Sequence, residues 1–203
     1  ILPMNPDKGY EKMSNIENVL ASRYASETMR RIWSPEAKIL YERELWIAVM
    51  KAQRELGLPI PAEAIDAYER QKENVSIENI ARRERELRHD VKARIEEFCA
   101  LAGHEHIHKG MTSRDLTDNV EQMQIRKALM LTRDRYVSVL RHVAELADRY
   151  AAVPIAARTH NVAAQPTTIG RRFAMFGQEM LIAFRHMESV IDQYALRGIV
   201  GAV

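Results

Sequence analysis

Polar clusters with side chains suited to acid–base chemistry and anion binding recur along this 203-residue chain, mostly at the ends of expected helices. Imidazole is the side chain best suited to proton transfer near neutral pH. Guanidinium groups and helix N-termini bind carboxylate or phosphate. Four clusters therefore hold the candidate site residues: Arg23-Tyr24, Arg88-His89-Asp90, His108 to Ser113, and Arg158 to Asn161.

Thr112 and Ser113 stand at the expected start of a long helix, and two interpretations of them remain open. They can cap the helix by accepting hydrogen bonds from its first N–H groups. The same helix terminus can instead hold an anionic group of a ligand. Lys109 and Arg114 flank the pair, and their positive charge favours anion binding.

The histidines differ in their settings. His160 lies in a polar Arg-Thr-His-Asn run that is followed by a Gln-Pro-Thr-Thr stretch, and this setting favours a role in proton transfer. His104, His106 and His108 raise the alternative of a metal site, but their alternating spacing suits a strand more than a helix. No acid-rich second cluster accompanies them, whereas zinc needs three or four ligands in a fixed geometry. We therefore expect no metal, with His104 and His106 in an exposed loop.

Helix signals dominate the chain, so we predict an all-α fold without strands. Ser34-Pro35-Glu36 combines an N-cap, a proline at the first helical position and an acid in the first turn, and Gly57 ends this helix. The other expected elements are a short helix after Pro61, one helical segment from Ser76 to Gly103, a loop to Gly110, a long helix over 111–153, a loop over 154–166 and a second long helix ending near Gly198.

Two domains are expected: a small helical domain at 1–111 and the start of a long-helix domain at 112–203. Residues 1–12 are either a native tail or an extension before Met13. A helix of about 40 residues extends roughly 60 Å, far more than a typical globular helix. Two such helices alone cannot cover apolar stripes of this width. We therefore expect further helices, supplied by missing sequence or by other subunits.

Composition excludes several functional classes. The net charge is only +2, from 30 basic and 28 acidic residues, so a nucleic-acid-binding surface is not expected. Cys99 is the only cysteine, which rules out an intrachain disulfide and favours a cytoplasmic setting. No apolar run approaches about 18 residues, so no membrane span is predicted. The first twelve residues also lack the apolar stretch of a signal peptide.

Six sequence blocks resemble, in the same order, motifs of the adenylosuccinate lyase family within the fumarase/aspartase superfamily. One block alone would be weak, but six in order are specific. The resemblance implies an all-α fold of three domains and a homotetramer with a long-helix bundle at its centre. The blocks are LASRYAS (20–26), IWSPEAK (32–38), RHDVKA (88–93), IHKGMTSRDLTDN (107–119), ARTHNVAAQPTTIGRRFA (157–174) and LRGIVGAV (196–203).

The resemblance implies a β-elimination that releases fumarate from adenylosuccinate, leaving AMP, and from the succinylated aminoimidazole carboxamide ribotide of purine synthesis. No metal or organic cofactor is implied. By motif match, His160 is the general acid that protonates the departing nitrogen, and His89 is the second active-site histidine. Thr112 and Ser113 match the pair that holds the succinyl carboxylate. The other matched substrate-binding residues are Arg23, Tyr24, Arg88, Asp90 and His108.

The chain departs from the family pattern in one respect. The family's catalytic base is a serine in a Ser-rich loop with a Met-Pro-Lys stretch, and these 203 residues contain no such stretch. We therefore expect the chain alone to be inactive. Two alternatives remain: a sister lyase, such as argininosuccinate lyase or the carboxymuconate cycloisomerase, and a non-catalytic helical scaffold or half-site. The clusters at 23–24 and 88–90 favour the nucleotide enzyme over its sisters.

Overall fold

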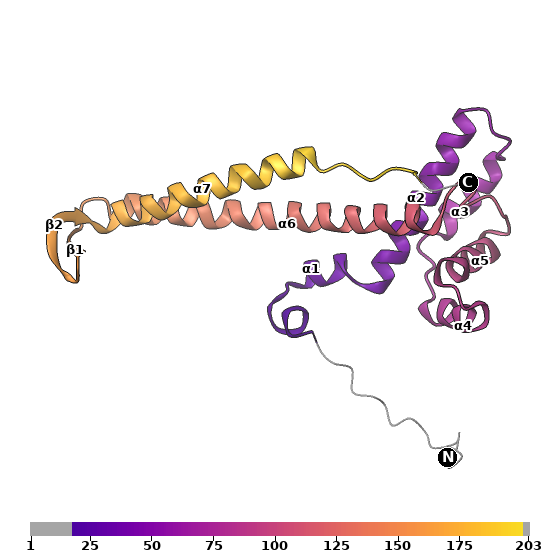
Figure 1. Cartoon of the computed structure of the whole chain (residues 1–203), viewed down its shortest axis with the longest axis horizontal. Coiled ribbons are helices and arrows are strands. Elements are labelled where there is room, and N and C mark those ends of the chain that lie inside the picture. Colours follow the sequence, from indigo (N-terminus) through magenta and orange to yellow (C-terminus); the bar gives the residue numbers. More distant parts are fainter. Residues whose placement is uncertain (1–17, 201–203) are drawn as a thin grey trace, which may run out of the picture.

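The computed structural model describes residues 18–200, and the tail expected at residues 1–12 lies outside this range. Short helices gather at one end, and two long antiparallel helices extend from them as an arm with a strand hairpin at its tip (Figure 1). The elements are η1 (Leu20–Tyr24), α1 (Glu27–Ile32), α2 (Pro35–Glu55), α3 (Ala62–Gln71), α4 (Ile77–Leu87), α5 (Asp90–Ala102), α6 (Ser113–Arg149), β1 (Pro154–Thr159), β2 (Val162–Thr168) and α7 (Ile169–Gln193). The prediction of a predominantly helical fold is confirmed.

Helix α2 begins and ends where its sequence signals predict. The Ser34 hydroxyl accepts a hydrogen bond from the Ala37 N–H at 3.1 Å, and Pro35 occupies the first helical position, where its missing N–H costs nothing. Gly57 follows the helix with φ of +89°, a conformation that glycine adopts without steric cost. The helix is therefore fixed locally at both ends.

The segment from Ser76 to Gly103 is two helices rather than the single segment we expected. Arg88 ends α4 in the left-handed region with φ of +53°. The Nδ1 atom of His89 then accepts the Lys92 N–H at 3.2 Å and so caps α5. No glycine or proline marks this break, because an arginine supplies the left-handed residue and a histidine supplies the cap.

The expected loop over 154–166 is a two-stranded antiparallel hairpin, so the prediction of no strands was wrong. Pro154 pairs with Thr168 at its base and Thr159 with Val162 at its tip. His160 and Asn161 form the two-residue turn, with φ of +49° and +64°. Two positive φ angles in succession are typical of the turn that matches the twist of paired strands.

Helices α6 and α7 form the arm. The 37 residues of α6 give it a length of about 55 Å. Helix α7 ends at Gln193, five residues before the predicted end, and an extended segment continues along α6 toward its N-terminus (Figure 1). At the hairpin end, α7 begins in close contact with α6: a Cβ on Gly170 would lie only 2.3 Å from the Ala147 carbonyl oxygen. Only glycine allows this approach.

Apolar side chains remain at the surface of α7. Met175, Phe176, Ile182 and Val190 are between 47% and 60% exposed. This agrees with the expectation that further helices must cover the arm. No helix within residues 18–200 is both long and apolar enough to cross a membrane. Helix α6 begins two residues past the domain boundary predicted at 111, and the division into two domains itself stays a prediction.

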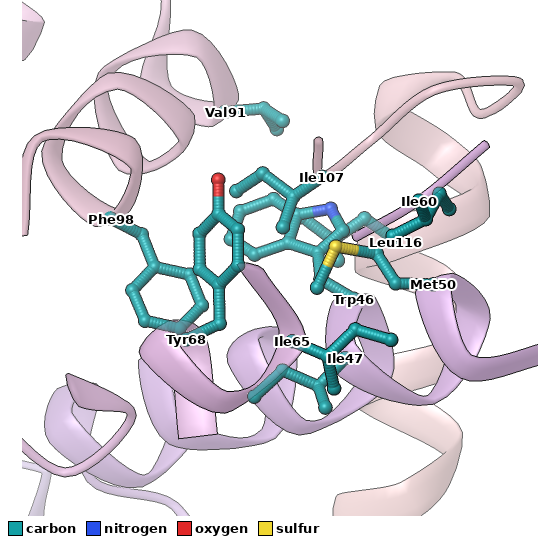
Figure 2. Packing of buried hydrophobic residues seen from close by; sticks show 10 residues of the cluster. All are labelled: Trp46, Ile47, Met50, Ile60, Ile65, Tyr68, Val91, Phe98, Ile107 and Leu116. Atoms are coloured by element: carbon teal, nitrogen blue, oxygen red, sulfur yellow. The ribbon is translucent and has the colours of Figure 1, made fainter. Parts of the chain in front are cut away.

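The main apolar core lies among the short helices, where Trp46 of α2, Tyr68 of α3 and Phe98 of α5 meet (Figure 2). The Tyr68 and Phe98 rings pack edge to face with centroids 4.8 Å apart. Leu116, near the start of α6, completes this core and is fully buried. The base of the long arm is therefore anchored in the small helical cluster.

Charged residues are buried beside this core. Arg43 and Glu97 form an ion pair at 2.6 Å, with side chains only 1% and 4% exposed. The Arg43 guanidinium also donates to the carbonyl groups of Gln71 and Lys72 and lies 4.4 Å from the Phe98 ring centroid. Satisfying a buried charge on several sides offsets much of its desolvation cost. This pair therefore links α2, α5 and the end of α3.

A second buried carboxylate, Glu42, is poorly paired. Arg94 Nε lies 2.7 Å from Glu42 Oε2, but neither Glu42 oxygen has a hydrogen-bond partner in the part of the chain that the structure describes. We therefore regard the contact as an ion pair only. Burial raises the pKa of Glu42 to about 7, and the positive charges of Arg94 and Lys38 limit the rise, whereas Asp90 adds to it.

Breaking the buried Arg43–Glu97 pair should destabilise the chain far more than breaking an exposed pair of equal length. Glu97→Gln leaves an uncompensated buried charge and should lower the free energy of unfolding by about 3–5 kcal/mol. The matched control is Glu69→Gln, because Lys51–Glu69 has the same 2.6 Å separation but is 50% and 32% exposed. The control should lose at most about 1 kcal/mol. Equal losses in urea unfolding would contradict this account.

The raised pKa of Glu42 should make stability fall as the pH rises. Below about 4.5 the carboxyl is protonated in both folded and unfolded chains, and between 4.5 and about 7 the folded chain binds the extra proton. The contribution of Glu42 to the free energy of unfolding is therefore complete below pH 4.5 and is lost as the pH rises through 7. The change amounts to up to about 3 kcal/mol.

Glu42→Gln removes this titration. The free energy of unfolding of the Glu42→Gln variant, minus that of the unsubstituted chain, should rise between pH 4.5 and 7.5. Urea unfolding at several pH values measures this difference. Glu55→Gln, at an exposed position of the same helix, is the control and should show a much smaller change. A Glu42→Gln difference that stays constant with pH would overturn the assignment.

Candidate active site

Four candidate segments differ in where the fold places them. His108 lies close enough to His89 before α5 and to Asp115 in the first turn of α6 for both charges to shift its pKa, which places the turn Arg88–Asp90, His108 and the start of α6 near one corner of the molecule. Arg88, His89 and Asp90 line a shallow pocket with three residues of α4, namely Ala81, Glu84 and Arg85. Helix N-termini, imidazoles and an arginine are thus grouped at one corner, a combination suited to binding an anion.

His108 is the most tightly held of the histidines at this corner. It lies in a turn with φ of +63°, and its Nδ1 atom accepts a hydrogen bond from the Trp46 indole at 3.0 Å. Burial lowers the pKa of His108, the Asp115 carboxylate opposes this effect, and His89 adds to the lowering. The imidazole is therefore held mainly in its neutral form at neutral pH.

His89 and Asp90 occupy the N-terminus of α5, where both are about half exposed. Burial alone raises the pKa of Asp90, but the Val91 N–H and the Arg94 guanidinium outweigh it, so the net pKa is lowered. Arg94 Nη2 lies 3.0 Å from Asp90 and its Nε faces Glu42. Asp90 is thus connected through one arginine to a buried carboxylate of α2.

Thr112 occupies the N-cap position of α6 and Ser113 is the first residue of the helix, and the anion-binding interpretation of the pair stays a prediction. The Thr112 backbone N–H donates to Asp115 Oδ2 at 2.9 Å. The other oxygen of the same carboxylate accepts the Val200 N–H at 3.0 Å. One buried carboxylate therefore joins the start of α6 to the segment after α7.

Asn119 binds that returning segment one turn further along α6. Its amide donates to the Gly198 carbonyl at 2.8 Å and accepts the Gly198 N–H at 2.9 Å, as a neighbouring strand would. Arg197 forms an ion pair with Asp118 beside it. The LRGIV block therefore packs against the block that contains Thr112 and Ser113, 79 residues away along the chain.

Arg23, Tyr24 and His160 are not part of this corner. Arg23 and Tyr24 lie on η1 and are exposed, and among residues 18–200 no hydrogen bond or ion pair joins them to the other candidate residues. His160 occupies the hairpin turn at the far tip of the arm (Figure 1). The length of α6, about 55 Å, separates it from Ser113. One copy of the chain cannot bring His160 to His89.

The histidine triplet does not form a ligand set. The rings of His104 and His106 lie 6.2 Å apart at a tilt, whereas Nδ1 of His108 is occupied by Trp46. Within residues 18–200, no group of three His, Cys, Asp or Glu side chains is arranged to hold a metal ion.

Residues that position the site were not identified from the sequence. Two of these, Asp115 and Arg94, had a usable signal. Asp115 stands three residues after Thr112, the spacing of a capping box, and Arg94 stands four residues after Asp90, the spacing of a helical ion pair. Trp46, Glu42 and Asn119 had none, because their partners are distant in the sequence.

Comparison with known proteins identifies the family of the chain. A protein-family model described as Lyase matches residues 20–203. The chain is 35% identical over 196 residues to adenylosuccinate lyase of Saccharomyces cerevisiae, an alignment that covers 92% of this chain and 40% of that protein. It is 32% identical over 197 residues to adenylosuccinate lyase of Schistosoma mansoni, covering 95% of this chain and 41% of that protein. The chain thus spans about two fifths of these relatives.

Solved structures share the fold. A fumarate lyase from Mesorhizobium sp. BNC1 superposes with a TM-score of 0.77 and 26% identity, over 88% of this chain and 43% of that one. The β-carboxy-cis,cis-muconate cycloisomerase of Acinetobacter calcoaceticus gives a TM-score of 0.73 at 20% identity, over 85% and 42%, which shows the fold alone. With a family match that covers nearly the whole described chain, this protein belongs to the lyase family.

Proposed function

We propose that the protein to which this chain belongs is an adenylosuccinate lyase. It eliminates fumarate from adenylosuccinate, leaving AMP, and from the succinylated aminoimidazole carboxamide ribotide. The observation that supports this proposal is the proximity of His108 to His89 and to Asp115 at the start of α6, near the candidate residues Arg88, Asp90, Thr112 and Ser113. These segments lie in the region aligned with relatives named adenylosuccinate lyase. The substrate carries two carboxylates and a phosphate, which suit such a corner.

In the proposed reaction, a base removes a proton from the succinyl carbon next to the one bonded to nitrogen. The electron pair forms the fumarate double bond as the C–N bond breaks, and His160 protonates the departing nitrogen as general acid. The base is a serine outside these 203 residues. His89 binds the substrate beside the acid, and Thr112 and Ser113 hold a succinyl carboxylate through the donors at the α6 N-terminus. Arg23, Tyr24, Arg88, Asp90 and His108 complete the binding residues.

The proposed active site is shared between copies of the chain in a homotetramer. His160 and His89 lie at opposite ends of a rigid helix, so a second copy must supply one of them. The exposed apolar residues of α7 supply an interface for such an assembly. We also propose a cytoplasmic location and no cofactor. The 203-residue chain alone is expected to lack turnover.

His160→Gln in the complete protein should lower kcat by about 10²–10⁴-fold, because it removes the proton donor to the leaving nitrogen. KM should change little, since the anion-binding corner is left intact. The assay is fumarate release from adenylosuccinate. His142→Gln, at an exposed position of α6, is the control and should retain full activity. An unchanged kcat in His160→Gln would remove this residue from the chemistry.

The competing functions separate in the same assay. A sister lyase would release fumarate from argininosuccinate, or act on a carboxymuconate, and leave adenylosuccinate untouched. A scaffold would turn over none of these substrates in its complete form. Wild-type release of fumarate from adenylosuccinate is the result expected here, and its absence would refute the proposed function.

A further inference from the structure

The contact between His108 and Trp46 fixes the direction of a hydrogen bond at the anion-binding corner. Trp46 lies on α2 and is 1% exposed, and its indole is packed within the apolar core (Figure 2). Its Nε1 atom is 3.0 Å from Nδ1 of His108. The two rings meet edge to face, with centroids 5.9 Å apart and planes at 86°. The contact therefore sets both the position and the orientation of the imidazole.

The chemistry of this contact decides which imidazole nitrogen carries a proton. An indole N–H can only donate, so Nδ1 of His108 must accept with its lone pair. In a neutral imidazole, the single proton then lies on Nε2. Protonating Nδ1 as well would set two N–H groups against each other within 3.0 Å. Both the cation and the other neutral tautomer are therefore disfavoured.

We propose that Trp46 is a positioning residue that holds His108 as the neutral Nε2–H tautomer, so that His108 presents a hydrogen-bond donor to an anionic group of the substrate. The role toward substrate rests on the proposed function, whereas the tautomer does not. A histidine held in this way cannot accept a proton at Nε2, and a neutral imidazole is a very weak acid. His108 is thus a binding group, separate in role from the general acid His160.

The groups around His108 support a neutral imidazole. Trp46 faces it from α2, Asp115 from α6, and His89 from the turn before α5. Burial and His89 lower the pKa of His108, and only Asp115 opposes them. Asp115 belongs to the first turn of α6, so the imidazole lies near the N-terminus of that helix, where a carboxylate is favoured.

Nitrogen NMR tests the tautomer directly in the 203-residue chain. The chain contains seven histidines, so the His108 signals of a sample labelled with ¹⁵N-histidine are assigned by their loss in His108→Gln. At pH 7, Nδ1 should resonate in the unprotonated range and Nε2 in the protonated range. A wild-type spectrum with a protonated Nδ1 would overturn the proposal, and this result needs no tryptophan variant.

Trp46→Phe tests the cause of the tautomer, because it keeps an aromatic ring at this buried position while removing the N–H donor. The single-tautomer pattern of His108 should be lost, with part of the population shifting to a protonated Nδ1. Trp33→Phe is the matched control: Trp33 is the only other tryptophan and is 47% exposed, so the pattern should persist. An unchanged pattern in a folded Trp46→Phe chain would show that Trp46 does not set the tautomer.

Steady-state kinetics of the complete protein tests the role toward substrate. Trp46→Phe should raise KM for adenylosuccinate about tenfold with kcat nearly unchanged, as expected when an interaction common to substrate and transition state is lost. A fall in kcat at constant KM would overturn the binding role. A wild-type protein that releases no fumarate would instead refute the proposed function and leave the NMR result standing.

Discussion

The rigidity of helix α6 determines the distance between the two groups of candidate site residues. Helix α6 runs for 37 residues without a break, and the groups at its two ends are held apart by its full length. The anion-binding corner with Ser113 lies at one end, and the hairpin with His160 lies at the other. Because neither end can fold back on the other, chemistry that needs both ends requires a second chain. The separation of the candidate residues into two groups thus follows from the length of α6.

Buried residues of helix α2 contact the candidate site residues directly or through Arg94. Glu42 and Trp46 lie one helical turn apart on its buried face. Trp46 contacts His108 directly, whereas Glu42 acts on Asp90 through Arg94. A third set of contacts, from Asp115 and Asn119, ties the start of α6 to the segment after α7. The candidate site residues are therefore held in place by contacts with buried residues.

Local signals predicted those parts of the fold that local chemistry determines. The Ser34-Pro35 start of α2, its end near Gly57 and the long α6 all follow from caps and periodicity. The hairpin was missed because its strands are mostly exposed and β2 shows no alternating burial, while its turn is formed by His160 and Asn161 instead of glycine. The break at Arg88 was missed because it also lacks glycine. Candidate site residues followed from motifs, but their supporting contacts join segments up to 85 residues apart, which no local pattern encodes.

The absence of a side chain at Gly170 has a mechanical consequence. A methyl group there would lie 2.3 Å from the Ala147 carbonyl oxygen and would force the start of α7 away from the C-terminal end of α6. Because α7 is about 37 Å long, a small change of its angle at this end moves its other end much further. A tilt of a few degrees at the hairpin would grow to a displacement of ångströms at the far end, where Gly198 must meet Asn119 within hydrogen-bond distance. Gly170 thereby helps to determine where the far end of α7 and the segment after it lie.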